Sequence, residues 1–377
     1  MKIINAKVFV NKEFVEGGID FDKKIIKVLS KEECCEDDCT FDAEGMYLIP
    51  GLIDIHTHGA LQTDVSDVEH MNLTRLSEYY ANDGVTSWCP TTLTVPEDVL
   101  NKAMEAFREF ERPVNGAKIA AVNMEGPFLS PQRAGAQNPG ALHLPDAHML
   151  ERLQKASGGL IKLVSVAPEL DGSLEFVKAV SGDVRVSIGH TTADYETAKE
   201  AFKAGISHVT HLYNCIPGIA HREPGPIPAA LEEGATVELI TDGYHVHPSV
   251  IRLTFELFGD RVVLISDSLR CAGMPDGDYN MGGLEITMSN GKATLMGKET
   301  LAGSSIHLME GLRRAVSFGV PLESAVYAAT KSPAEVIGCD RVIGSLEQGK
   351  SADFVLLDSE LNVKAVYING KCINRKD

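Results

Sequence analysis

The sequence predicts an α/β protein built on a (β/α)8 TIM-like barrel, with a small β-sandwich domain formed by the N- and C-terminal segments. Three observations favour this fold. Eight short apolar runs, each ending in polar residues or glycine, lie between residues 48 and 268. Segments with apolar residues at helical spacing separate most of these runs. This unit of a strand followed by a helix recurs over roughly 250 residues, which favours a closed barrel over the alternative, a doubly wound sheet.

The expected barrel strands follow one another along the middle of the chain. In order they are LIPGLIDIHTHG (48–59), GVTSWCPTTLT (84–94), KIAAVNMEGPF (118–128), IKLVSVAPE (161–169), VRVSIGHTT (184–192), HVTHLYN (208–214), TVELITDGYH (236–245) and RVVLISDS (261–268). The clearest helices between them are LTRLSEYYAND (73–83), VLNKAMEAFREFE (99–111), YETAKEAFKAG (195–205) and VIRLTFELFGD (250–260).

The two ends of the chain do not share this rhythm. Residues 1–50 and residues 345–377 both contain short strands joined by turns, such as MKIINAKVFV and ADFVLLD. We therefore expect two domains: a small β domain made of 1–50 and 345–377, and a catalytic barrel made of 51–344.

Composition excludes several classes of function. The formal net charge of -18 argues against nucleic-acid binding, because a phosphate backbone requires clustered lysine and arginine. The eight cysteines show no paired CxxC spacing, so we expect reduced thiols in a cytoplasmic protein. No stretch of 18 apolar residues is present, so the sequence predicts neither membrane insertion nor secretion.

Residues capable of metal chemistry follow six of the eight predicted strands. The carboxyl ends of barrel strands open on one face, so residues far apart in sequence are expected to meet there. Each residue alone has an ordinary explanation, such as a buried histidine or a helix cap. Together they are the ligand types of a Zn²⁺ or Fe²⁺ site: His56, His58, Glu125, His190, His211, His245 and Asp267.

This combination predicts hydrolysis assisted by a divalent metal. A bound ion lowers the pKa of water toward roughly 7, and a nearby carboxylate can accept the proton as the water attacks a carbonyl carbon. Asp267 is the best candidate for this general base. The same group can return the proton to a leaving amine, as hydrolysis of an amide requires.

Several longer motifs resemble a known family. They are HTHG, MEGPFLSPQRAGAQNPGALH, IGHTTA, THLYNCIPGIAHREPG, ITDGYHVHP, ISDSLRCAG, LAGSSIHLMEG and IGSLEQGKSADFVLLD. They are similar to the signature blocks of the N-acetylglucosamine-6-phosphate deacetylases, within the amidohydrolase superfamily. The resemblance implies removal of acetate from N-acetylglucosamine 6-phosphate to give glucosamine 6-phosphate, a step of amino-sugar catabolism.

The resemblance also implies a metal centre. In such a site Glu125, His190 and His211 hold the metal, and Asp267 is the base. Some family members replace the first two histidines with amides and hold one ion. This chain keeps His56 and His58, so it resembles the members that can hold a second ion, with Glu125 as the bridge. Zn or Fe is expected, with one or two ions per chain.

A phosphosugar pocket is implied as well. Arg222 resembles the phosphate-binding arginine of the family and His245 its partner, supplied across the interface of a homodimer. Asn214 and the backbone around Cys215 would position the same ligand. One residue departs from the pattern: Gln137 stands where many members have a histidine that polarises the substrate carbonyl. An amide can donate a hydrogen bond to an oxyanion, but it carries no positive charge.

Two other functions remain as alternatives. A cyclic-amide hydrolase or a nucleobase deaminase could use the same barrel. The first usually carries a carbamylated lysine after the fourth strand, where this chain reads VSVAPE, and the second would not be expected to carry Arg222. A barrel that serves as a non-catalytic scaffold is the other alternative, although such proteins typically lose their metal ligands.

Overall fold

A computed structural model describes residues 1–35 and 40–375 of the chain. In these ranges the barrel strands follow each other in chain order and all pair in parallel. They are β6 (Leu52–Thr57), β9 (Val85–Thr92), β11 (Val122–Met124) with the short β10 (Lys118–Ile119) before it, β12 (Ile161–Val166), β13 (Arg185–Ile188), β14 (His208–Val209), β15 (Thr236–Ile240) and β16 (Val262–Ile265).

The barrel closes between its first and last strands. A parallel bridge joins Thr57 to Ser268, and the backbone N–H of Asp267 donates to the carbonyl of His56 at 2.9 Å. The His58 N–H donates to the carbonyl of Ser268 at 2.9 Å. The predicted closed barrel is therefore confirmed, and the doubly wound alternative is excluded.

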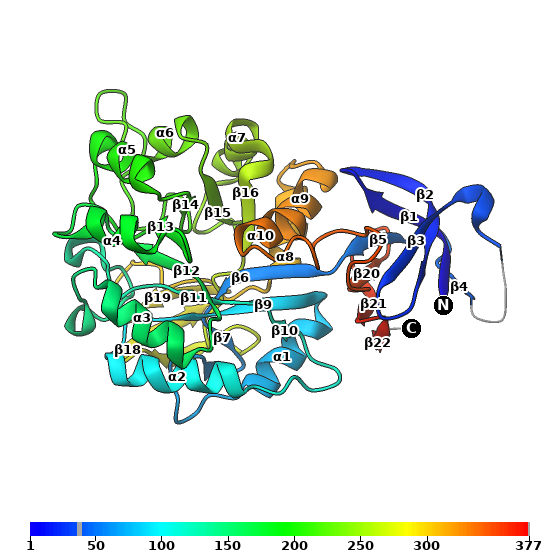
Figure 1. The fold of residues 1–377 in the computed structure, drawn as a ribbon, viewed down its shortest axis with the longest axis horizontal. Coiled ribbons are helices and arrows are strands. Elements are labelled where there is room, and N and C mark those ends of the chain that lie inside the picture. Colours follow the sequence, from blue (N-terminus) through cyan, green and yellow to red (C-terminus); the bar gives the residue numbers. More distant parts are fainter. Residues whose placement is uncertain (36–39, 376–377) are drawn as a thin grey trace.

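Helices surround the barrel, as predicted (Figure 1). Their apolar faces pack on the strands, and side chains such as Asn72, Asp146 and Asp194 cap their first turns by accepting backbone N–H groups. One helix follows each barrel strand: α1 (Leu73–Asn82), α2 (Glu97–Glu109), α3 (Ala147–Ala156), α4 (Ser173–Val180), α5 (Tyr195–Ala204), α6 (Pro226–Glu232), α7 (Pro248–Phe258) and α8 (Leu308–Ser317). None of these helices, nor any other in the described ranges, is both long and apolar enough to cross a membrane.

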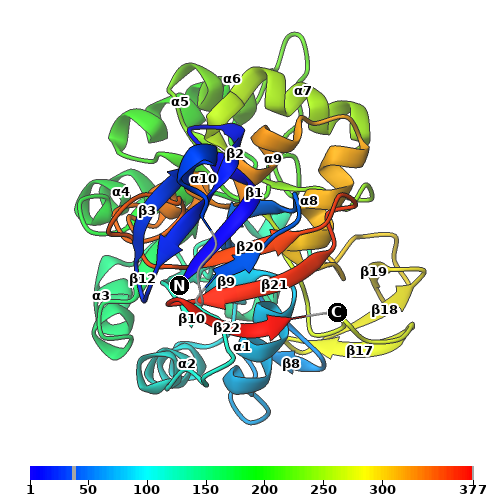
Figure 2. The ribbon, with the colours of Figure 1, turned by 90° about the vertical axis from the view of Figure 1, so that its right-hand side faces the viewer.

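Both ends of the chain build a separate β domain, as predicted (Figure 2). Its core contains packed aromatic rings: Phe354 and Tyr367 stack with centroids 4.5 Å apart, and Phe21 meets Phe354 edge-on at 4.9 Å. The domain boundaries given above stay a prediction. The strands are β1 (Lys2–Val10), β2 (Glu13–Phe21), β3 (Ile25–Ser30), β4 (Thr40–Asp42), β5 (Tyr47–Pro50), β20 (Phe354–Leu357), β21 (Val363–Ile368) and β22 (Lys371–Arg375).

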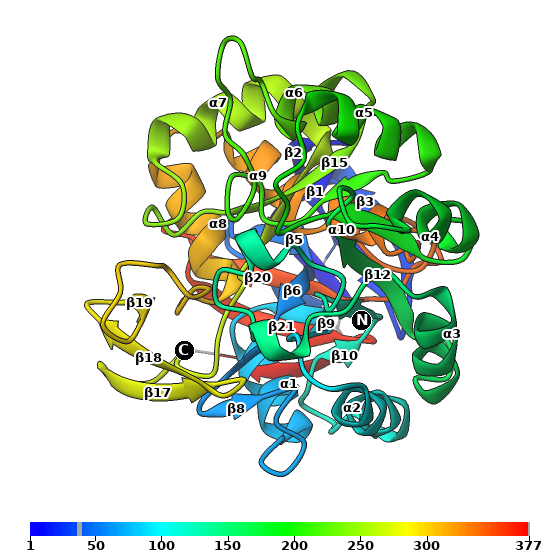
Figure 3. The same ribbon diagram turned by 90° about the vertical axis from the view of Figure 1, so that its left-hand side faces the viewer.

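The small domain lies at the end of the barrel where the strands begin. β5 leads directly into β6, and α9 (Leu322–Ala329) and α10 (Lys331–Val336) lie between the barrel and the β domain (Figure 1). The carboxyl ends of the barrel strands therefore open on the opposite face, which Figure 3 shows.

One element on this open face was not predicted. Between β16 and α8 the described residues form an antiparallel sheet of β17 (Gly277–Met281), β18 (Leu284–Ser289) and β19 (Lys292–Leu295). It lies beside the barrel opening (Figure 3). A smaller ribbon, β7 (Gly59–Ala60) and β8 (Thr63–Asp64), follows β6 on the same face.

Candidate active site

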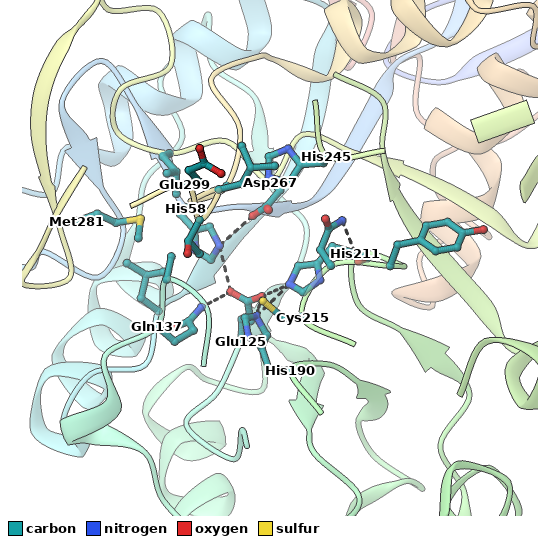
Figure 4. A pocket seen from close by; sticks show the side chains of 18 residues that line it. His58, Glu125, Gln137, His190, His211, Cys215, His245, Asp267, Met281 and Glu299 are labelled. Carbon is teal, nitrogen blue, oxygen red and sulfur yellow. Dashed lines mark hydrogen bonds and ion pairs between the residues drawn. The ribbon is translucent and has the colours of Figure 1, made fainter. Parts of the chain in front are cut away.

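The carboxyl ends of the strands surround a pocket of about 320 Å³ (Figure 4). Most of the residues that the sequence analysis selected line it, although they come from different strands. These are His58, Glu125, Gln137, His190, His211, Asn214, Cys215, His245 and Asp267. His56 lies directly beside them and is completely buried.

Glu125 is the centre of the arrangement. Its Oε1 lies 2.7 Å from Nε2 of His211 and 3.1 Å from Nε2 of His190. Its Oε2 lies 3.2 Å from Nε2 of His58, and Nε2 of His56 is 3.6 Å from Oε1. Each of the four imidazoles thus directs the same nitrogen atom toward one buried carboxylate.

This geometry suits metal ligands. The set His56, His58 and Glu125, and the set Glu125, His190 and His211, each place one ligand atom per residue within 4.8 Å of the others. On a tetrahedral ion with bonds of about 2.0–2.1 Å, neighbouring ligand atoms lie roughly 3.4 Å apart. The Nε2 atoms of His190 and His211, 3.1 Å from each other, approach that spacing.

The outer nitrogens of three rings are held in place. A metal-binding imidazole usually donates its other N–H to a carboxylate or a carbonyl, which fixes the tautomer. Here the Nδ1 partners are the Glu238 carboxylate for His56 (2.8 Å), the Thr91 carbonyl for His58 (2.9 Å) and the Arg133 carbonyl for His190 (2.9 Å). The Nε2 lone pairs are thereby turned inward. Nε2 of His56 is buried and has no hydrogen-bond partner among the described residues, as expected for a nitrogen that serves a metal ion.

The backbone at the site is strained. His190, His211 and Asp267 have φ angles of 47°, 26° and 49°, in the left-handed region that non-glycine residues rarely adopt. Such conformations persist where the surrounding structure imposes them, and they concentrate at functional sites. Each of these residues follows the end of a barrel strand, where the turn directs the side chain into the pocket.

The imidazoles around Asp267 lower the pKa of its carboxyl group. Burial alone would raise the pKa of Asp267, but the hydrogen bond with His58 and the charge of His56 lower it below its usual value. Oδ1 of Asp267 lies 3.2 Å from Nε2 of His58 and 3.5 Å from Nε2 of His56. For His58, burial alone would lower the pKa, but Asp267 and Glu125 raise it to about 9.

Gln137 occupies a different position from the one expected of a simple oxyanion donor. Its Oε1 accepts the backbone N–H of Thr94 at 2.7 Å, and its Nε2 donates to Oε2 of Glu125 at 2.5 Å. The side chain is 4% exposed. One amide hydrogen is therefore already used by Glu125, and only the second remains for a substrate carbonyl.

The structure brings only some of the expected phosphate-binding residues to the pocket. His245 lines the pocket of its own chain. Asp242, just after β15, holds it there by accepting hydrogen bonds from its Nδ1 at 2.7 Å and from its backbone N–H at 2.9 Å. The supply of His245 across a dimer interface stays a prediction. Arg222 is exposed, contacts His221 at 2.8 Å and does not line the pocket. No lysine or arginine in the described part of the chain lines it.

Sequence reasoning missed two parts of the site. Glu238 is completely buried in β15, and its position inside the apolar run TVELI was a usable signal, since an acid in a barrel strand requires a partner. The β17–β19 sheet and the loop after it contribute Met281, Glu299 and Leu301 to the pocket wall. The GG and NG pairs in MGGLE and SNGKA are hairpin signals that could have revealed this sheet.

Comparison with known proteins agrees with this geometry. A model of the Amidohydrolase family matches residues 47–373. This chain belongs to the amidohydrolase family. The family assignment covers both the barrel and the C-terminal strands of the small domain.

Several amidohydrolases resemble it along most of their length. The N-acetylgalactosamine-6-phosphate deacetylase of Escherichia coli O157:H7 is 37% identical over 334 residues, 88% of this chain and 88% of that protein. The N-acetylglucosamine-6-phosphate deacetylase of Bacillus subtilis is 37% identical over 331 residues, 86% of this chain and 83% of that protein. The structure of a mutant of the Mycobacterium smegmatis N-acetyl-D-glucosamine-6-phosphate deacetylase, in complex with N-acetyl-D-glucosamine-6-phosphate, has a TM-score of 0.91 and 30% identity, and the match covers 99% of both chains.

Proposed function

We propose that this amidohydrolase hydrolyses the acetamide of N-acetylglucosamine 6-phosphate to glucosamine 6-phosphate and acetate. One observation carries the proposal. Four imidazole Nε2 atoms face the buried Glu125, and Asp267 stands beside them in the pocket. The names of the relatives and of the solved structures support the same reaction.

The donor atoms fit a divalent metal ion, Zn or Fe. Glu125, His190 and His211 would hold one ion, and His56 and His58 with Glu125 would hold a second. When bound, such an ion supplies a water of lowered pKa and polarises a carbonyl oxygen.

Asp267 would transfer the proton in this reaction. It accepts a proton from the attacking water as the new C–O bond forms at the acetyl carbon. It then donates that proton to the amine nitrogen as the C–N bond breaks. A carboxylate is ionised at neutral pH, which is the form that the first step requires. The free N–H of Gln137 would hydrogen-bond to the oxygen of the acetyl group.

The phosphate requires a positive charge, and within residues 1–35 and 40–375 no lysine or arginine lines the pocket of one chain. His245 faces the pocket, whereas Arg222 is exposed outside it. We propose that a second copy of the chain brings Arg222 to this end, with Asn214 and the backbone of Cys215 as further contacts. The exposed apolar side chains of Ile219 and Tyr244, close in sequence to Arg222 and His245, support a homodimer on this face.

The rival reactions lack support in the site. After β12 the chain continues with Ala167 and Pro168, so no lysine stands there for carbamylation, and Glu125 occupies the bridging position. A scaffold without activity would not need four converging imidazoles. A cytoplasmic location stays a prediction.

The experiment that tests the function is acetate release from a panel of four sugars. The panel contains N-acetylglucosamine and N-acetylgalactosamine, each with and without the 6-phosphate, because the relatives carry both sugar names. We expect turnover of N-acetylglucosamine 6-phosphate and a large loss without the phosphate. Equal turnover of the unphosphorylated sugar would contradict the proposed substrate class.

A further inference from the structure

Glu238 is a completely buried carboxylate next to the site. It belongs to β15, it is 0% exposed, and it contacts the ring of His56 without lining the pocket. Such a carboxylate is tolerated only when its oxygen atoms are fully paired. Its Oε2 lies 2.8 Å from Nδ1 of His56 and accepts the backbone N–H of His211 at 3.0 Å, and its Oε1 lies 3.2 Å from Nε2 of His208.

One oxygen of Glu238 therefore contacts both halves of the candidate metal site. Through Oε2 it holds the ring of His56, from β6, and the backbone of His211, just after β14. Of the four histidines that face Glu125, His56 alone has a carboxylate as its Nδ1 partner among the described residues. His58 and His190 donate to backbone carbonyls, and Nδ1 of His211 has no hydrogen-bond partner there. A carboxylate fixes the tautomer and also makes the opposite nitrogen a stronger ligand.

We propose that Glu238 is a positioning residue that makes the His56–His58 half of the site able to hold a metal ion. This inference rests on the metal-dependent function proposed above. Glu238 does not touch the pocket, so it acts through His56. Without its acceptor, His56 has no fixed tautomer, and Nε2 no longer presents a lone pair to the ion.

A purely structural role for Glu238 is the competing explanation. In that case the carboxylate would serve only to balance His208, which also contacts Thr236 at 2.6 Å. The substitution His208→Gln distinguishes the positioning role from the structural role. It removes the His208 imidazole from Glu238 and leaves the contact of Glu238 with His56 in place.

The test measures metal binding rather than activity. Metal-free wild type, Glu238→Gln, Glu238→Leu and His208→Gln are titrated with Zn²⁺, and bound zinc is counted by elemental analysis after dialysis. The double variant His56→Gln, His58→Asn gives the one-ion reference. We expect two ions for wild type and for His208→Gln. Affinity for one ion should fall roughly 10–100-fold in the Glu238 variants, more for leucine than for glutamine, because the glutamine oxygen still accepts the N–H groups.

The outcomes decide the inference. Two tightly bound ions in both Glu238 variants, a single ion in wild type, or equal weakening of both ions would overturn it. If Glu238→Leu does not fold, the comparison of Glu238→Gln with His208→Gln still decides. Failure of the proposed deacetylation is a separate result, because it would show as two bound ions without acetate release.

Discussion

At the scale of single residues, Asp267 carries the most specific prediction. The substitution Asp267→Asn keeps the shape of the side chain but removes the proton acceptor. We expect kcat to fall roughly 10²–10⁴-fold, the range for loss of a general base, with KM and metal content largely unchanged. Steady-state kinetics and elemental analysis of the purified variant measure this. High residual activity would remove Asp267 from its assigned role.

Gln137 gives a second prediction at this scale. Because its amide holds Oε2 of Glu125, Gln137→Leu should weaken metal binding as well as slow the reaction, each roughly 10–100-fold. The exposed Gln132, whose side chain accepts a hydrogen bond from Ser130, provides the matched control in Gln132→Leu. A loss of kcat with unchanged metal affinity would return Gln137 to the simpler role of oxyanion donor.

Some residues of the candidate site could be predicted from the sequence, and others could not. The types and order of His56, Glu125, His190 and Asp267 were sufficient to predict a metal site, because barrel strands bring their carboxyl ends together. Hydrogen bonds between distant side chains were not predictable. Gln137 meets Glu125 through the path of a loop, and no local pattern specifies that path.

At the scale of elements, the loop after β19 supports the backbone of Asp267, the proposed general base. The N–H of Ser304 donates to the carbonyl of Asp267 at 2.7 Å, and the N–H of Leu269 donates to the carbonyl of Ser304 at 3.0 Å. A Cβ on Gly303 would lie 2.8 Å from the carbonyl oxygen of Asp267. This segment therefore continues the barrel closure and holds the strained backbone of Asp267.

Gly303→Ala tests this support. We expect kcat to fall at least roughly tenfold, with a loss of stability of about 1–3 kcal/mol, because the new methyl group displaces the backbone of Asp267. Gly297→Ala is the matched control: its φ of 72° is also positive, but no described atom lies within 4 Å of the added Cβ. Kinetics and urea unfolding of both variants are compared. Equal effects of the two would show that backbone strain alone is responsible.

Elements differed in how well the sequence predicted them. The barrel strands and the helices were recognised because buried parallel strands are continuous apolar runs and the helices are amphipathic. The β17–β19 sheet was missed because its strands are only partly buried and lie after the regular repeat. β14 consists of just His208–Val209, so most of the residues 208–214 that were predicted as a strand lie in the turn after it.

At the scale of the whole molecule, a chain with a net charge of -18 needs a local cation to bind a phosphate, and in the proposed homodimer Arg222 supplies it. Arg222→Ala should raise KM for the phosphosugar roughly 10–100-fold with little change in kcat, because a charged hydrogen bond to phosphate contributes about 1.5–3 kcal/mol. Arg108→Ala, at an exposed arginine on α2, is the control. An unchanged KM would exclude Arg222 from the phosphate site.

A mixture of variants tests whether two chains share the site. An Arg222→Ala chain paired with an Asp267→Asn chain would have one site with an intact Asp267 and a partner's Arg222. Mixing the two variants under exchanging conditions should therefore restore part of the activity at low substrate. No recovery in confirmed mixed dimers would contradict the shared site.

The central claim is that this amidohydrolase uses metal to deacetylate a phosphosugar. The most direct measurement is acetate release from N-acetylglucosamine 6-phosphate before chelation, after chelation, and after return of Zn²⁺, Fe²⁺ or Mn²⁺, with circular dichroism to confirm the fold. We expect activity that is lost on chelation and restored by at least one metal. Activity that survives complete removal of metal, or a folded and metal-loaded protein that releases no acetate, would contradict it.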